Sequence, residues 1–172
     1  MVKKRALIAG VVALLICGGF YLSGNIGIAA DEINDAQMRT VSWNPSDYRV
    51  TGTSSGGGTL YVGVMWMKDY SDARYFIYIK KGGLSLGWHF LQSGGLSEVD
   101  GLRAFDCGEH GTAYVALNQD GGVRRIEFED GWEPSVREGV RGPICEQSRG
   151  VVRFYDAYGS VIEPNKVTLI EP

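Results

Sequence analysis

The sequence predicts an all-β fold: a small antiparallel sandwich or partly closed barrel, built of glycine-turn hairpins and preceded by a hydrophobic N-terminal helix. Glycine supplies 25 of the 172 residues. Much of it lies in clusters between short segments rich in Val, Ile, Tyr and Phe, which is the composition of strands joined by turns. These clusters occur at residues 56–58, 82–83, 94–95 and 121–122.

The N-terminus has the layout of an export signal. Residues 3–5 are basic and precede an uncharged apolar run of 17 residues, 6–22. This length lies between the roughly 7 to 15 residues of a signal-peptide core and the roughly 20 of a spanning helix, so both interpretations stay open. A cut after Ala29 would leave small residues, Gly27 and Ala29, where a signal peptidase needs them.

We therefore expect residues 1–30 to be a signal peptide or a membrane anchor. Residues 31–172 are expected to fold outside the cytosol in either case, because the cationic end stays inside. The expected location is extracytoplasmic, periplasmic or secreted, with a tether to the inner membrane if the apolar run is kept. About 142 residues are enough for one domain with one core and too few for a propeller.

The net charge of the exported part disfavours some classes of binding partner. The first 30 residues hold three of the 17 Lys and Arg and none of the 20 Asp and Glu, which leaves residues 31–172 with a net charge of −6. Phosphate backbones and anionic lipid repel an acidic domain. We therefore expect no nucleic-acid partner, and membrane contact only through residues 6–22 if they are not cleaved.

Two cysteines, Cys107 and Cys145, remain in the exported part. Outside the cytosol an even pair is most simply a disulfide, and the loop it would close is long enough to stabilise a small domain by about 3 to 4 kcal/mol. A metal pair is the rival interpretation. Neither cysteine belongs to a CxxC sequence, so we expect a disulfide and no metal site.

A first hairpin is predicted to turn at Gly82 and Gly83, because two-residue turns need the positive φ that glycine adopts freely. Residues 74–81 would then pair with residues 84–91, with one face of the hairpin wholly apolar. A slip by one residue would mix the two faces, so the pattern favours this register. The apolar pairs are Tyr75 with Phe90, Ile77 with Trp88, and Ile79 with Leu86.

A second hairpin is predicted to turn at Gly121 and Gly122. Its inner face would be apolar and its outer face wet, as is usual for an antiparallel pair. Starting the turn one residue earlier would place a charged residue on the core side, which favours the glycine pair. The inner pairs would be Leu117 with Ile126, and Val115 with Phe128.

Other elements follow from composition. Further strands are predicted at residues 38–43, 48–53, 59–67, 151–156 and 167–170. Residues 60–67 read LYVGVMWM, which is apolar on both faces and indicates a central strand covered on both sides. One short polar helix, with little apolar face to bury, is predicted at residues 31–38.

The second face of the first hairpin is the predicted binding surface. It offers aromatic rings and cations, which are frequent anchors of protein interfaces. The alternative is that a second layer of the fold covers this face and makes its aromatic residues ordinary core. The predicted binding residues are Arg74, Phe76, Tyr78, Lys80 and His89.

The sequence carries no recognisable catalytic or phosphate-binding motif. Its densest titratable cluster is residues 106–111, where Asp106, Glu109 and His110 lie beside Cys107. A short polar segment flanked by glycines is usually a turn, so we expect neither a catalytic site nor a cofactor there.

These observations favour a non-catalytic interaction module of the cell envelope with a protein partner, for example a stoichiometric inhibitor or immunity-type partner of an envelope enzyme. The alternative is a hydrolase of envelope polymer that uses the acidic and histidine residues near Cys107. The sequence thus leaves enzymatic activity open and favours a non-catalytic protein.

Overall fold

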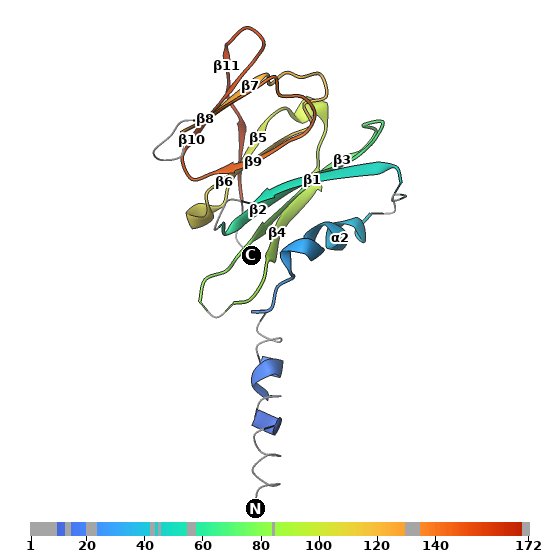
Figure 1. The fold of residues 1–172 in the computed structure, drawn as a ribbon, viewed down its shortest axis with the longest axis vertical. Coiled ribbons are helices and arrows are strands. Elements are labelled where there is room, and N and C mark those ends of the chain that lie inside the picture. Colours follow the sequence, from blue (N-terminus) through green and yellow to red (C-terminus); the bar gives the residue numbers. More distant parts are fainter. Residues whose placement is uncertain are drawn as a thin grey trace, which may run out of the picture.

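The computed structural model describes residues 10–12, 15–19, 24–41, 44, 46–54, 58–83, 85–129 and 135–169. These residues form an all-β sandwich whose three four-stranded sheets do not close into a barrel (Figure 1). The N-terminal sheet has the order β1 (Tyr48–Ser54), β2 (Leu60–Met67), β3 (Ala73–Ile79), β4 (His89–Gly95). The middle sheet has the order β12 (Asn165–Thr168), β5 (Arg103–Asp106), β6 (Thr112–Ala116), β9 (Ile144–Ser148). The distal sheet has the order β11 (Val161–Ile162), β10 (Val151–Tyr155), β7 (Arg125–Glu129), β8 (Ser135–Glu138).

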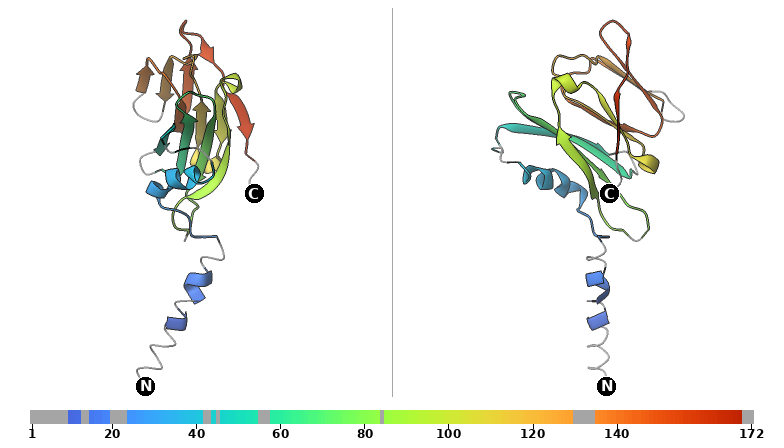
Figure 2. Two further views of the ribbon diagram at one scale, coloured as in Figure 1. Left: turned by 90° about the vertical axis from the view of Figure 1, so that its right-hand side faces the viewer. Right: turned by 180° about the vertical axis from the view of Figure 1, so that it is seen from behind.

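The sheets pack as layers with apolar cores between them. The first core joins the N-terminal sheet to the middle sheet, and the second joins the middle sheet to the distal sheet. A third core lies between the other face of the N-terminal sheet and helix α2 (Ile33–Met38), which follows the short 3-10 helix η1 (Ala30–Glu32) (Figure 1). Residues 10–12 and 15–19, the described part of the N-terminal segment, project from the end of the domain opposite the distal sheet (Figure 2).

Strand β6 shows why the middle sheet is central. Ala113 and Val115 belong to the first core, whereas Tyr114 and Ala116 belong to the second. Successive side chains of a strand point to opposite faces, so both faces of β6 are buried. Strand β2 is likewise covered on both sides, with Val62 and Val64 in the first core and Met65 in the third, which confirms the prediction for LYVGVMWM.

The predicted register of the first hairpin is wrong. Strand β3 does pair with β4, but Ile77 lies opposite Gln92 and Tyr78 opposite Phe90. The connection is the longer segment 80–88 instead of a two-residue turn. The cause is competition from the N-terminal segment: Leu86 and Trp88, the residues predicted to pair with β3, form bridges with Ile26 and Ile28.

The second predicted hairpin does not form either. Strand β6 lies in the middle sheet and β7 in the distal sheet, so residues 117–124 carry the chain from one sheet to the next. Leu117 faces the first core and Ile126 the second, and the two never share a face. The buried Asn118, at a φ of 47°, closes this crossing, since its amide accepts from Val123 N at 2.9 Å and donates to Val123 O at 3.3 Å.

Of the other predicted elements, the strands at 48–53, 59–67 and 151–156 are confirmed as β1, β2 and β10. The last predicted strand is displaced by two residues and becomes β12, which pairs with β5 in parallel. The strand at 38–43 is wrong, because Met38 ends α2; residues 42 and 43 lie outside the described residues. The helix at 31–38 is confirmed, but it does bury an apolar side chain, Ile33.

The predicted disulfide is wrong, because Cys107 and Cys145 are both free and buried. Cys107 directly follows β5 and Cys145 lies in β9, and β6 runs between these two strands. Two interstrand spacings of about 4.8 Å separate their backbones, whereas a disulfide needs Cα atoms within about 7 Å. The two thiols border the same core without being able to reach each other.

We expect thiol labelling to count both cysteines. In a Cys17→Ser background, the denatured and unreduced protein should take up label at Cys107 and at Cys145. Labelling of the native protein should be slow, because burial raises the pKa of each thiol to about 11 and only the thiolate reacts readily. If the denatured and unreduced chain takes up no label, the two cysteines form a disulfide after all, and the structure is contradicted at this point.

Parts of the predicted N-terminal helix are described. Residues 10–12 and 15–19 are helical, and the remaining residues of the apolar run lie outside the described residues. Within the described part of the chain, none of the helices is both long and apolar enough to cross a membrane.

Candidate functional site

The predicted binding surface is mostly covered by another layer of the fold. Phe76 and Tyr78 are buried in the third core, with Ile33 of α2 packed against them, and Gln37 Nε2 donates to Tyr78 Oη at 2.7 Å. His89 is also buried. The prediction that Phe76 and Tyr78 point outward is therefore wrong, because it did not foresee that α2 lies on this face. His89 lies opposite Ile79, which packs against the first core, so the shifted register of β4 places His89 on the other face of the sheet.

Arg74 and Lys80, the other two predicted binding residues, are exposed at opposite ends of this region. Arg74 lies near the start of β3, and Lys80 follows its end. The Lys80 ammonium stands 4.8 Å from the centroid of the Trp88 ring. The structure thus does not bring the five predicted residues together as one open surface, and a binding role for Arg74 or Lys80 stays a prediction.

His89 has an ordered polar environment. Its Nε2 lies 2.6 Å from Ser85 Oγ in the connection that follows β3. Burial lowers the pKa of His89 below its usual value, and the nearby charge of Lys81 lowers it further, whereas a hydrogen bond that the ring donates to the backbone of Leu86 raises it. The ring is therefore neutral in the folded protein at neutral pH.

We expect His89 to make the fold sensitive to acid. As the pH falls through about 6.5, the ordinary pKa of histidine, the unfolded chain binds a proton that the folded protein resists, so the free energy of unfolding decreases. Urea unfolding at about pH 7 and about pH 5 should show a smaller decrease for His89→Gln than for the wild type. Equal decreases in the two proteins would contradict the lowered pKa.

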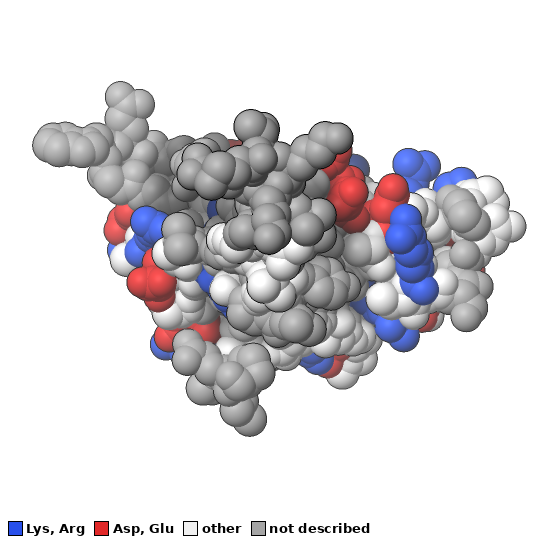
Figure 3. Space-filling model, turned by 90° about the horizontal axis from the view of Figure 1, so that it is seen from below, with Lys and Arg blue, Asp and Glu red and all other residues white. Residues whose placement is uncertain are grey.

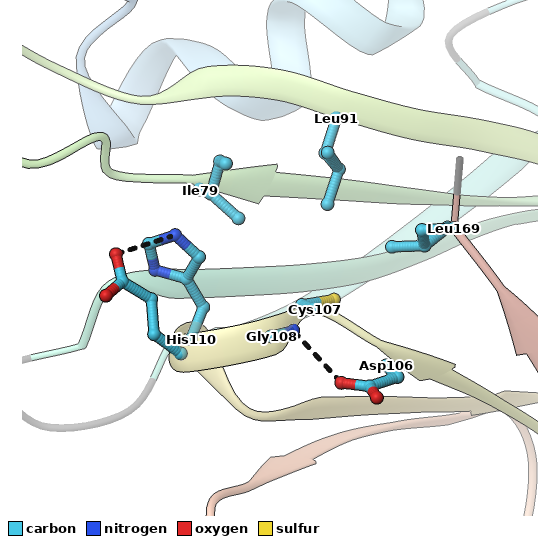
Figure 4. A pocket seen from close by; sticks show the side chains of 8 residues that line it. Ile79, Leu91, Asp106, Cys107, Gly108, His110 and Leu169 are labelled. Atoms are coloured by element: carbon cyan, nitrogen blue, oxygen red, sulfur yellow. Dashed lines mark hydrogen bonds and ion pairs between the residues drawn. The ribbon is translucent and has the colours of Figure 1, made fainter. Parts of the chain in front are cut away.

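A pocket opens at the edge of the first core, between β3 and β4 on one side and the connection from β5 to β6 on the other (Figure 4). Its volume is about 300 Å³. We call it the His110 pocket. Its lining residues are Ile79, Leu91, Asp106, Cys107, Gly108, Glu109, His110 and Leu169.

A β-bulge places Leu91 in this pocket. The register of β3 and β4 shifts between Ile77 and Tyr78, so that Gln92 and Phe90 have partners and Leu91 is the additional residue. Bulges often redirect a side chain beside a functional site. Here Leu91 packs against the first core with Ile79, whereas Phe90 stays exposed.

A rigid turn places His110. The 3-10 helix η3 (Gly108–His110) is closed by Cys107 N donating to Gly111 O at 2.8 Å, and Gly108 N donates to Asp106 Oδ1 at 3.0 Å. Gly108 and Gly111 have φ values of 58° and 103°, which side-chain-bearing residues rarely adopt. The expectation that this cluster is a turn is thus confirmed.

The His110 pocket brings a thiol, a carboxylate and an imidazole beside apolar walls. Its thiol, Cys107, donates weakly to Phe105 O, and burial raises its pKa to about 11, which keeps it protonated and a poor nucleophile. Glu109 is 84% exposed, and its Oε1 lies 3.9 Å from His110 Nε2. His110 Nδ1 is buried and has no hydrogen-bond partner among the described residues, so it could bond a bound group.

A second hollow, with a volume of about 450 Å³, shares Glu109 and His110 with this pocket. Its other lining residues include Lys80, Lys81 and Arg149. We call it the lysine hollow. A ligand that places an apolar group in the His110 pocket could therefore place a negative group beside these three cations.

Among the described residues, there is no group of three or more His, Cys, Asp or Glu side chains that could hold a metal ion. Comparisons with protein-family models, with curated proteins and with solved structures found no match for the chain.

Sequence reasoning located one wall of the pocket and missed the other. The sequence marks residues 106–111 as its densest titratable cluster. Leu91 and Leu169 do not stand out, since each is one apolar residue in a strand-like or terminal segment, and a bulge leaves no signal in the spacing of apolar residues.

Proposed function

We propose that the chain is an exported, non-catalytic interaction module of the cell envelope, and that the His110 pocket receives an apolar side chain of a protein partner. The observation that carries this proposal is the pocket itself, which joins the apolar walls of Ile79, Leu91 and Leu169 to an unpartnered His110 Nδ1. Pockets with apolar walls and a few polar groups are typical binding sites.

The proposed location follows from the sequence. The basic residues 3–5 and the apolar run 6–22 support export, with residues 31–172 outside the cytosol. An envelope protein meets other envelope proteins, and a partner enzyme inhibited in a stoichiometric complex would suit a small binding domain. The lysine hollow favours a partner segment with a carboxylate close to its apolar anchor.

The geometry supports binding over hydrolysis. Asp106 serves the turn by accepting from Gly108 N, and Glu109 points into solvent. A nucleophilic thiol needs a lowered pKa, whereas burial raises that of Cys107 to about 11. Loss of a measured hydrolytic activity against envelope polymer in Glu109→Ala and His110→Ala would favour the hydrolase instead.

A pocket-filling substitution tests the proposal. We expect Leu91→Trp in the epitope-tagged full chain to lower recovery of the partner from envelope extract by about tenfold or more, because the larger ring occupies the site of the anchor. Val99→Trp is the matched control, since Val99 is 98% exposed and does not line the pocket. Equal recovery with both variants, each shown to be folded, would contradict the proposal.

A further inference from the structure

We propose that the N-terminal apolar segment is retained as a membrane anchor, because the residues that follow it are built into the folded domain. This inference rests on the proposed export of the chain and goes beyond it by naming the lipid bilayer as a permanent partner. It also decides between the two fates, cleavage and retention, that the length of the apolar run leaves open.

The foot of the segment, residues 25–28, is hydrogen-bonded to the connection between β3 and β4. Gly27 N donates to Leu86 O at 2.6 Å and Leu86 N to Asn25 O at 2.7 Å. Ile28 and Trp88 exchange two further backbone bonds, of 3.0 Å and 2.8 Å. Ser85 Oγ adds a bond to Asn25 O at 3.2 Å. Residues 25–28 are therefore held to the domain by two β-bridges, Ile26 with Leu86 and Ile28 with Trp88.

Two glycines make this close approach possible. A Cβ on Gly27 would overlap the carbonyl of Trp88, and a Cβ on Gly87 would lie 2.8 Å from Gly27 C. Gly87 also has a φ of 81°, which side-chain-bearing residues rarely adopt. The foot and the connection thus fit each other at positions where neither has a side chain.

A cut after Ala29 would remove this foot. Ile28 packs against the third core, beside Trp88, which is 6% exposed. A chain that begins at Ala30 would leave the backbone groups of Leu86 and Trp88 without these partners and would uncover the Trp88 ring. The fold is therefore complete only when residues 25–28 remain attached.

The segment beyond the foot is suited to a bilayer. Its described apolar side chains are about half or more exposed: Val11, Val12, Leu15 and Ile16. The 17-residue run with cations only on its N-terminal side matches a helix whose basic end stays in the cytosol.

The end of the domain that carries the foot is compatible with lipid. Ile26, Leu86 and Phe90 are exposed apolar residues there, and Lys80 and Lys81 lie in the same connection. The visible part of this end carries both basic and acidic side chains (Figure 3). Apolar and basic residues together suit a membrane surface.

The test is fractionation of cells that express the full chain with active signal peptidase. We expect the chain in the membrane fraction, resistant to alkaline extraction, with its first 30 residues intact by mass spectrometry and its domain digested by protease added outside. A soluble extracytoplasmic protein that begins at Ala30 would overturn retention and leave export standing. An intact chain in the soluble cytosolic fraction would overturn both.

A variant tests the fitted foot independently of location. Gly87→Ala should loosen residues 25–28, so that protease added to membranes releases the domain about tenfold faster or more. Gly82→Ala is the matched control, because a Cβ there has nothing within 4 Å and its φ is not positive. Equal release of the two variants would show that the foot is not held by the domain and would overturn the inference.

Discussion

Phe76→Ala is expected to lower the free energy of unfolding by about 3 to 5 kcal/mol, as much as or more than Ile77→Ala at about 2 to 5 kcal/mol. Both side chains are fully buried, although they point to opposite faces of β3. Ile77 belongs to the core shared with the middle sheet, and Phe76 to the core beneath α2. Each truncation leaves a cavity that the packed layers cannot close.

Equilibrium denaturation of the two variants in urea measures this directly, with Val99→Ala as a control for a fully exposed position. The control should stay within about 0.5 kcal/mol of the wild type. If Phe76→Ala behaved like Val99→Ala while Ile77→Ala lost stability, then α2 would not cover β3, and this face would be the open binding surface that is one of the two interpretations of the sequence.

A chain that begins at Asp31 is expected to be about 2 kcal/mol less stable than one that begins at Gly24. The hydrogen bonds of residues 25–28 are worth about 0.5 to 1.5 kcal/mol each, which the cost of ordering those residues largely offsets. The apolar contacts of the partly buried Ile28 with the third core, and with Trp88 in it, then make the net contribution stabilising, since fully burying one such side chain contributes about 1.5 to 3 kcal/mol.

Thermal or urea unfolding of the two chains side by side checks this value. Ile28→Ala in the longer chain should reproduce much of the difference, because it removes the apolar contact and keeps the backbone bonds. Equal stability of the two chains would mean that residues 25–28 contribute nothing to the fold.

The strands that could be predicted are those that the local sequence identifies by itself, without knowledge of their pairing partners. In residues 60–67 both alternating sets of positions are apolar, which predicts a strand buried on both faces. The structure covers both faces of this strand. Strand β10 was found in the same way, from a compact run of Val, Phe and Tyr. In both cases the burial of the strand matches the apolar pattern of its own residues, so no distant segment had to be known.

The pairings could not be predicted because they depend on segments far away in the sequence. Glycine pairs at 82–83 and 121–122 suggested hairpins, but Leu86 pairs with Ile26, and residues 117–124 cross between sheets. A pair of glycines is compatible both with a hairpin within one sheet and with a longer connection to another segment. The apolar residues on either side of the pair do not indicate which core they join. The disulfide failed for the same reason, since β6 separates two cysteines that the sequence places in one domain.

Photocrosslinking from the rim of the His110 pocket is the most direct test of the proposed binding role. A photoreactive residue at position 109, which is exposed beside the pocket, is compared in cells with the same residue at the exposed position 99. The proposed function predicts an adduct with one extracytoplasmic protein from position 109, its loss when Leu91→Trp is added, and no such adduct from position 99. No adduct from position 109, or the same adduct from both positions, would contradict it.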